Sequence, residues 1–152
     1  MSTDSASSYT HWKLEYDEHN IAWLHLDMAG SAVNLLSGAV LEELRSLLDE
    51  LADKLPQGAI IVSDKKAGFI FGADIKEFLE LDDVSQSQPF LDRGHEIMDK
   101  LAALPCPTVS MVNGMCLGGG MELSLACNYI VAADNSSTRL GLPEITLGIH
   151  PG

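Results

Sequence analysis

Apolar and polar residues follow two different patterns along the chain. Short apolar runs are typical of buried strands, and they predict strands at residues 12–16, 21–26, 58–63, 69–71, 108–112 and 129–132, with an extended segment at 138–142. Apolar residues that recur every three or four positions predict helices at residues 37–55, 75–80, 90–104 and 121–127. Strands that alternate with helices favour an α/β architecture with parallel strands.

Some segments can be interpreted in more detail. The first two strands, joined by polar residues 17–20, are expected to form a β-hairpin. Ser37 is expected to cap a helix whose apolar stripe consists of Leu41, Leu44, Leu48, Leu51 and Leu55. The mostly polar residues 82–88 are expected to be mobile, and residues 1–10 to form a disordered tail ahead of a single domain at residues 11–152.

Composition narrows the class of protein. A chain of 152 residues with 46% hydrophobic residues can build one packed domain. No apolar run approaches the ~20 residues that span a membrane, and the polar start lacks the pattern of a secretory signal. Three cysteines in apolar sequence, Cys106, Cys116 and Cys127, favour reduced thiols and a cytoplasmic location over a disulfide framework. The net charge of -13 argues against a general nucleic-acid binder, although a few lysines could still meet a phosphorylated small molecule.

Three consecutive glycines, residues 118–120, join the strand at residues 108–112 to the helix that follows. The first turn of a helix has unpaired N–H groups and the positive end of the helix dipole, so it suits an anion or a developing oxyanion. Glu122 lies just inside that first turn, and a second strand–glycine–helix junction occurs at Gly72. A glycine-rich turn that only lets the helix pack close to the strand explains the same pattern equally well.

Two carboxylates stand out in apolar surroundings, Glu122 and Glu144. Amides from the two glycine junctions could bind one oxygen while a carboxylate moves a neighbouring proton, which is what an enolate intermediate requires. Two glutamates favoured by helix dipoles are the alternative, and spacing alone leaves both open. The sequence has no phosphate-binding P-loop, no GxSxG and no HExxH motif. The five histidines show no metal-ligand spacing; His25 is expected to be structural, and His150 either lines a pocket or lies in a loop without a role.

Four stretches resemble motifs of the crotonase superfamily, the enoyl-CoA hydratases and isomerases, and they occur in that family's order. They are NLLS at residues 34–37, FIFGADIKEF at 69–78, PTVSMVNGMCLGGGMEL at 107–123 and LGLPEITLGIHPG at 140–152. The resemblance implies an α/β fold of the ClpP/crotonase type, a spiral of ββα units. The sequences of the second and fourth stretches also resemble the N-terminal part of the multifunctional fatty-acid-oxidation α-subunits.

The resemblance implies roles for particular residues. The N–H groups of Ala73 and Gly119 would form an oxyanion hole for a thioester carbonyl, and Glu122 and Glu144 would add water to a 2-enoyl-CoA. The residues implied to bind the acyl-CoA substrate are Gly72, Asp74, Ile75, Lys76, Gly118, Gly120 and, near its nucleotide, Lys65 and Lys66. No metal or redox cofactor is implied, because coenzyme A belongs to the substrate.

The resemblance also has departures. Phe71 and Leu140 stand where many members have alanine and phenylalanine. Family domains run on well past the final Pro-Gly, so residues 11–152 would be a truncated N-terminal core without the C-terminal helices. A homotrimer, a hexamer or a β-oxidation complex is implied for the complete protein. Isomerase activity and a non-catalytic acyl-CoA-binding module remain alternatives, whereas a relative of serine proteases is disfavoured because no serine stands beside the glycine turn.

Overall fold

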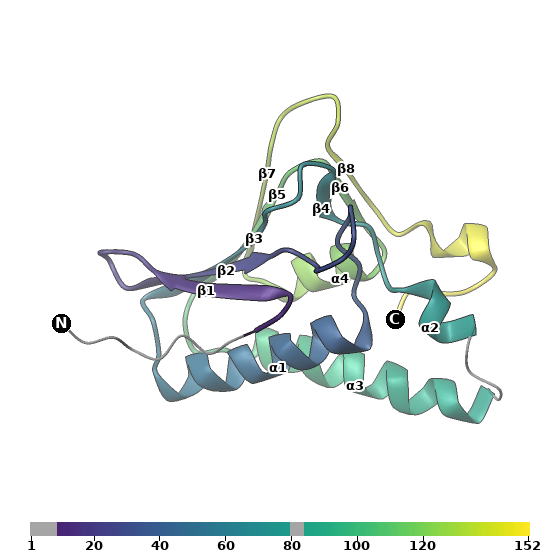
Figure 1. The fold of residues 1–152 in the computed structure, drawn as a ribbon, viewed down its shortest axis with the longest axis horizontal. Helices are drawn as coiled ribbons and strands as arrows, with labels where there is room; N and C mark the ends of the chain where they lie inside the picture. Colours follow the sequence, from purple (N-terminus) through teal and green to yellow (C-terminus); the bar gives the residue numbers. More distant parts are fainter. Residues whose placement is uncertain (1–8, 80–83) are drawn as a thin grey trace.

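The larger of two sheets forms the centre of the molecule. The computed structural model describes residues 9–79 and 84–152. Five strands pair in the order β1-β2-β3-β5-β7 (Figure 1), with the bounds Trp12–Tyr16, Ile21–Leu26, Gly58–Ser63, Thr108–Val112 and Tyr129–Ala132. Only β1 runs antiparallel to its neighbour in this sheet, and β2, β3, β5 and β7 are parallel. The predicted hairpin and the predicted parallel strands are therefore confirmed.

A smaller parallel sheet contains β4, β6 and β8, with the bounds Gly68–Ile70, Met115–Leu117 and Arg139–Gly141. Each of these strands follows directly after a strand of the larger sheet and is followed by helical structure. The helical segments that follow are α2 and α3 at Ile75–Leu79 and Val84–Ala102, α4 at Gly119–Ala126, and the 3-10 helix η1 at Pro143–Leu147. This repeated order of strand, strand and helix is the predicted ββα spiral.

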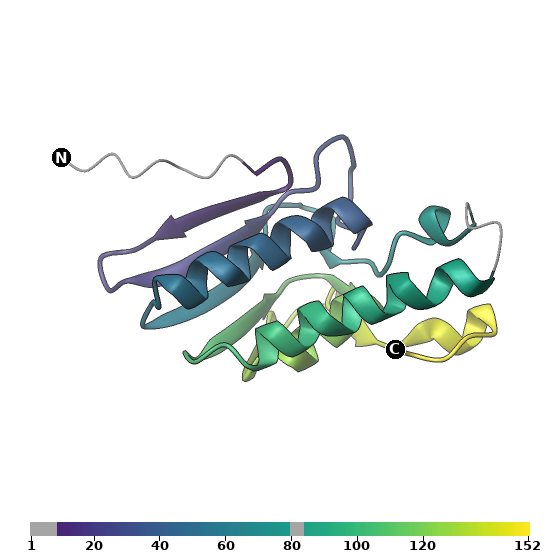
Figure 2. The same ribbon diagram turned by 90° about the horizontal axis from the view of Figure 1, so that it is seen from below.

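Helices α1, at Gly38–Asp53, and α3 lie side by side along one face of the larger sheet (Figure 2). The hydroxyl of Ser37 accepts a hydrogen bond from the N–H of Val40 and so caps α1 as predicted. The predicted stripe of α1 is buried in the core together with apolar residues of the sheets and of α3. Its last member, Leu55, is instead exposed, because α1 ends at Asp53 and the following Pro56 disfavours helical geometry at Leu55.

Several boundaries differ from the prediction. The helix expected at residues 90–104 begins at Val84, so it includes residues 84–88, which were expected to be mobile; residues 82–83 lie outside the described part. Polar residues do not prevent a helix whose outer face is solvated, and the side chain of Gln88 donates to Asp92 one turn later. Strand β6 was not predicted, and α4 begins at the second glycine of the triple. Of the expected tail, Tyr9 and Thr10 are described, and both contact α1: the Tyr9 hydroxyl donates to Glu50 at 3.2 Å, and the N–H of Thr10 donates to Glu43 at 2.8 Å.

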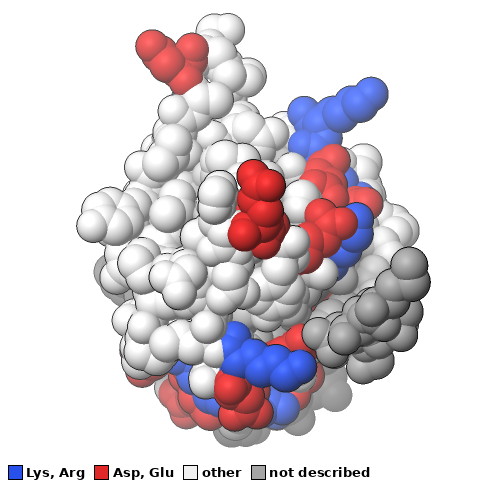
Figure 3. Space-filling model, turned by 90° about the vertical axis from the view of Figure 1, so that its left-hand side faces the viewer, with Lys and Arg blue, Asp and Glu red and all other residues white. Residues whose placement is uncertain are grey.

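The surface is divided between charged and uncharged areas. On the face in Figure 3, acidic and basic side chains lie mainly at the right and the base, further acidic side chains lie at the upper left and near the centre, and a broad area at the left carries neither. Strands β5 and β7 expose Met111, Tyr129 and Val131, of which Met111 and Val131 are paired in register. Across residues 9–79 and 84–152, no helix has the length and apolar character needed to cross a membrane.

Candidate active site

The two glycine junctions lie side by side. Strands β4 and β6 are parallel neighbours, so the bends that follow them emerge at the same edge of the small sheet. A Cβ atom added to Gly118 would lie 3.6 Å from Cα of Gly72, and one added to Gly119 would lie 3.6 Å from the amide nitrogen of Ala73. The structure therefore brings together the two amides that the sequence could only suggest as a pair.

The N–H groups of Ala73 and Gly119 have no hydrogen-bond acceptor among the residues that the structure describes. Leu36 pairs with the segment around Ala73 as an isolated parallel bridge: its N–H donates to Gly72 at 2.8 Å, and its carbonyl accepts from Asp74 at 3.2 Å. Neither of these hydrogen bonds uses the N–H of Ala73. Gly119 is the first residue of α4, where an N–H has no partner within the helix. Two donors are thus available to one acceptor beside them.

The three consecutive glycines serve different purposes. Gly118 makes the bend: its φ is +52°, a backbone conformation that residues with a side chain rarely adopt. Gly120 packs against β4, because a Cβ there would lie 2.6 Å from both Cβ and the carbonyl oxygen of Ile70. Gly119 faces Ala73. Close packing, one of the two interpretations of the glycine motif, therefore holds for Gly120, while the other interpretation concerns the amide of Gly119.

Glu122 lies on the first turn of α4, half-buried beside Gly119. Its Oε2 would lie 3.7 Å from a Cβ on Gly119, and its Oε1 accepts a hydrogen bond from the N–H of Gly152 at 2.6 Å. A Cβ on Gly152 would be 3.0 Å from both Glu122 Oε1 and His95 Nε2, so the imidazole of His95 is also near this carboxylate. Sequence reasoning missed both His95 and Gly152, since their proximity to Glu122 depends on how α3 and the C-terminus pack (Figure 2).

Glu144 approaches the junctions from η1. Its Oε1 would lie 3.1 Å from a Cβ on Gly118, so the carboxylate sits directly against that bend. Its Oε2 is buried and has no hydrogen-bond partner among the residues the structure describes. A buried carboxylate oxygen without a partner is unusual, and it suits a group that meets a water molecule or a substrate. The neighbouring apolar residues Ile145, Leu147 and Ile149 are exposed.

The remaining residues predicted to bind the substrate differ in how exposed they are. Asp74 is at the start of α2, and its carboxylate accepts the N–H of Lys76 at 3.1 Å. Ile75, Lys76 and Lys66 are exposed. Gly72 is buried beside Gly118, as described above.

Lys65 has a structural role in the described fold. Its ammonium donates to the carbonyls of Met28 and Ser31 at 2.9 and 2.6 Å, and it pairs with Asp27 at 2.5 Å. The side chain is only 14% exposed. A phosphate would have to compete with these contacts, so the predicted role of Lys65 in nucleotide binding is harder to accommodate than that of Lys66 or Lys76.

Asn34 joins the strands beneath the site, which sequence reasoning did not anticipate. Its buried amide donates to the carbonyls of Leu26 and Phe69 and to the hydroxyl of Ser63, and its side-chain oxygen accepts from Met28. Its own carbonyl accepts from Phe71 at 2.9 Å. A lone asparagine within the apolar run of residues 33–36 was the available signal. It fixes the segment that leads from β4 to Ala73.

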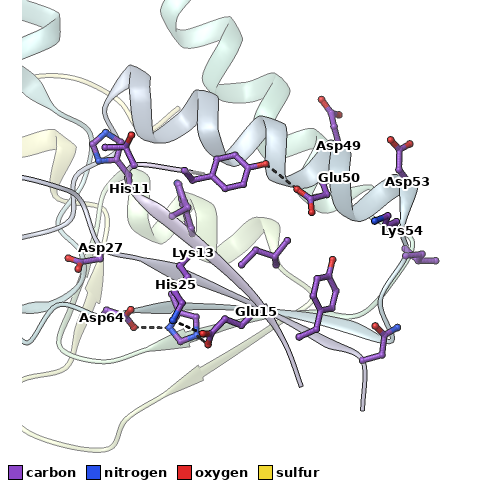
Figure 4. Close-up of a pocket in the computed structure, with 17 residues that line it drawn as sticks. His11, Lys13, Glu15, His25, Asp27, Asp49, Glu50, Asp53, Lys54 and Asp64 are labelled. Atoms are coloured by element: carbon purple, nitrogen blue, oxygen red, sulfur yellow. Dashed lines mark hydrogen bonds and ion pairs between the residues drawn. The ribbon is translucent and has the colours of Figure 1, made fainter. Parts of the chain in front are cut away.

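A separate hollow lies elsewhere, between α1 and β1 (Figure 4). Within it, His25 Nδ1 lies 2.8 Å from Asp64 and its Nε2 lies 3.5 Å from Glu15, which also pairs with Lys13. His25 is thus partnered, as expected of a structural histidine. Because these charged groups are satisfied by one another and no glycine junction reaches them, the glycine junctions remain the candidate site.

The cysteines and metal-binding side chains add no second centre. Cys106, Cys116 and Cys127 are buried and free. Burial raises the pKa of the Cys127 thiol to about 11, so it is protonated near neutral pH. Across residues 9–79 and 84–152, no three histidine, cysteine or carboxylate side chains are grouped to hold a metal ion.

Comparison with known proteins agrees with this geometry. Residues 17–152 match the profile of the family described as enoyl-CoA hydratase/isomerase. The chain belongs to this family. Its relatives include the fatty acid oxidation complex subunit alpha of Vibrio cholerae, 41% identical over 93% of this chain and 20% of the relative. The protein of the same name from Idiomarina loihiensis is 36% identical over 100% of this chain and 21% of the relative. The chain thus spans about a fifth of the length of these relatives, and the expected resemblance to the fatty-acid-oxidation α-subunits is confirmed.

Solved structures of the family share the fold. The enoyl-CoA hydratase from Bacillus anthracis superposes with a TM-score of 0.85 at 33% identity, over 94% of this chain and 54% of that chain. A hydratase subunit from Geobacillus kaustophilus gives a TM-score of 0.81 at 27% identity, over 96% of this chain and 54% of that chain. The predicted crotonase fold is confirmed.

Proposed function

We propose that this site adds water to a 2-trans-enoyl-CoA, a hydro-lyase reaction of fatty acid β-oxidation. The observation that carries the proposal is the pair of unpaired amides, Ala73 and Gly119, with Glu122 beside Gly119 and Glu144 beside the neighbouring Gly118. Few other reactions need two donors for one oxygen and two acids beside the adjoining carbons.

The first element of the mechanism is stabilisation of charge. The thioester carbonyl oxygen would accept hydrogen bonds from Ala73 and Gly119. When water adds to the β-carbon, the electron pair of the double bond moves toward that oxygen and forms an enolate. Fixed N–H donors stabilise this developing charge more than they stabilise the neutral carbonyl, which lowers the barrier. The positive end of the α4 dipole acts in the same direction.

The two glutamates would divide the proton transfers. Glu122, held by the N–H of Gly152, would accept a proton from water as the oxygen bonds to the β-carbon. Glu144 would deliver a proton to the α-carbon, and the unpartnered Oε2 is available to hold water or product. One proton leaves water and one reaches carbon, so the site returns to its starting state once the two carboxyl groups exchange a proton.

The rest of the substrate would extend away from the junctions. Coenzyme A belongs to the substrate, and the reaction as proposed needs no metal or redox cofactor. Lys66 and Lys76 are exposed and could meet its phosphates. A homotrimer, a hexamer or a β-oxidation complex, and a cytoplasmic location, remain part of the proposal for the complete protein.

Isomerisation is a second candidate for the same site. Moving a double bond from the γ,β to the β,α position needs one carboxylate that takes a proton from one carbon and returns it to another, with the enolate held by the same amides. Glu144 fits this role because its Oε2 has no partner in the described structure. A binding module without turnover is the alternative from another class.

The test is loss of ultraviolet absorption of the conjugated enoyl thioester, measured on the protein at its full natural length. Glu122→Gln and Glu144→Gln should each slow hydration by ~10²–10⁴-fold, the usual size of a general acid–base effect. Glu18→Gln, which changes an exposed turn residue, should leave the rate unchanged. Binding of acyl-CoA by calorimetry without any turnover would instead identify a binding module, and unchanged rates in both site variants would exclude the mechanism.

A further inference from the structure

We propose that Leu36 is a positioning residue that sets the spacing between the Ala73 and Gly119 amides. This inference rests on the proposed function, because spacing matters only if both amides meet one oxygen. Leu36 lies far from both in sequence, in the loop that precedes α1. It contacts neither reacting carbon in the proposal, so it would act through the two amides.

The backbone of Leu36 holds the first junction. Its N–H donates to the carbonyl of Gly72 at 2.8 Å, and its carbonyl accepts from the N–H of Asp74 at 3.2 Å. These bonds flank Ala73 on both sides. The orientation of the Ala73 peptide is therefore fixed while its own N–H stays unpaired.

The side chain of Leu36 contacts the second junction. Its Cδ1 would lie 3.1 Å from a Cβ on Gly119, closer than the 3.6 Å from that point to the Ala73 nitrogen. The residue is only 3% exposed, so the core surrounds this side chain. One residue thus touches both junctions, with its backbone on one and its isobutyl group against the other.

The two contacts can be separated by mutation. Leu36→Ala keeps both backbone bonds and removes only the contact with Gly119. Without that contact, α4 can shift relative to Ala73, and a misplacement of about 1 Å can reduce catalysis by as much as ~10²-fold. Leu36→Met keeps most of the volume and serves as the conservative variant. Leu47→Ala, at a fully buried leucine of α1, controls for general loosening of the core.

The experiment combines kinetics with NMR of the unliganded protein at full natural length, at a temperature where circular dichroism shows all variants folded. We expect Leu36→Ala to lower kcat by ~10–100-fold with little change in KM, Leu36→Met to restore most of it, and Leu47→Ala to stay within about 3-fold of wild type. Equal losses in the two alanine variants, or full activity in Leu36→Ala, would overturn the proposal.

The NMR measurement keeps the inference testable if the proposed function fails. In Leu36→Ala, the amide resonances of both Ala73 and Gly119 should move, and in Leu47→Ala neither should. If wild type shows no turnover, the function is wrong, and movement of both resonances would still support the coupling of the junctions by Leu36. Movement of neither, or of Ala73 alone, would overturn it.

Discussion

Gly120 and Ile70 are in contact with no room for a side chain between them. A Cβ on Gly120 would lie 2.6 Å from both the Cβ and the carbonyl oxygen of Ile70. This distance is shorter than real Cβ contacts in proteins. The backbone of α4 therefore rests directly on β4. This contact limits how closely the helix can approach the strand.

Alanine substitutions should separate packing from chemistry within the glycine motif. Gly120→Ala must push α4 away from Ile70, and overpacking of this kind typically destabilises a core by about 1–3 kcal/mol or more. Gly119→Ala meets Leu36 Cδ1 at 3.1 Å and the Ala73 nitrogen at 3.6 Å, so a small shift of the leucine side chain can accommodate it, and it should cost less stability than Gly120→Ala.

The two variants are to be compared by denaturant unfolding and by hydration rate. We expect Gly120→Ala to lose stability, and Gly119→Ala to keep most of its stability while turnover falls at least ~10-fold, because the methyl group crowds the space beside the amides. Full turnover in a folded Gly119→Ala variant would speak against the site.

Asn34 should be among the most sensitive polar positions. Its side chain makes four hydrogen bonds in the core, and Asn34→Ala leaves those buried partners unsatisfied. We expect a loss of about 2–4 kcal/mol in the free energy of unfolding. The exposed side chain of Asn135 also makes four hydrogen bonds, but water can replace them. Asn135→Ala should therefore cost less, about 1 kcal/mol or below, and equal losses would contradict this role for burial.

The lysines should fall into two groups. Lys76→Ala and Lys66→Ala should weaken binding of an acyl-CoA by about 3–10-fold each, less at high salt, because exposed charges are screened. Lys65→Ala should mainly lower thermal stability, since its ammonium holds the loop at Met28 and Ser31. Calorimetry and thermal unfolding measure the two effects. A salt-independent loss of affinity in Lys76→Ala would argue against contact with phosphate.

The thiols should be protected in the folded state. Burial raises the pKa of all three cysteines, that of Cys127 to about 11. At pH 8 all three should resist a maleimide and react fully in denaturant. Because a thiol whose pKa is raised by folding ionises more readily in the unfolded chain, stability should fall as the pH rises from about 9 toward 11. Rapid reaction of the native protein with the maleimide, detected by mass spectrometry, would contradict this burial.

Local patterns predicted most of the strands and helices because their apolar residues follow the period of the structure that buries them. The stripe of α1 and the run at β5 are examples. Strand β6 was missed because three residues between glycines carry too little pattern. The start of α3 was missed because its first residues are polar, and a solvated helix face leaves no apolar signal.

The pattern of residues suggested the parts of the candidate site, and it offered their assembly around one oxygen only as a possibility, which the family resemblance made an expectation. Glu122 and the glycines were visible because glycines at a strand–helix junction are unusual. The contacts of Leu36, His95 and Gly152 beside the site were not predicted, although two of the three lie in the quoted stretches, because these contacts depend on long-range packing. The different purposes of Gly119 and Gly120 could not be told apart until β4 was placed beneath α4.

The most direct test is a crystal structure of the protein, at full natural length, with a non-hydratable acyl-CoA thioester bound. The account predicts that the thioester oxygen lies about 2.7–3.1 Å from the amide nitrogens of both Ala73 and Gly119, with Glu122 and Glu144 beside the α- and β-carbons. A thioester that contacts only one of these amides, or that lies in the hollow between α1 and β1, would contradict it.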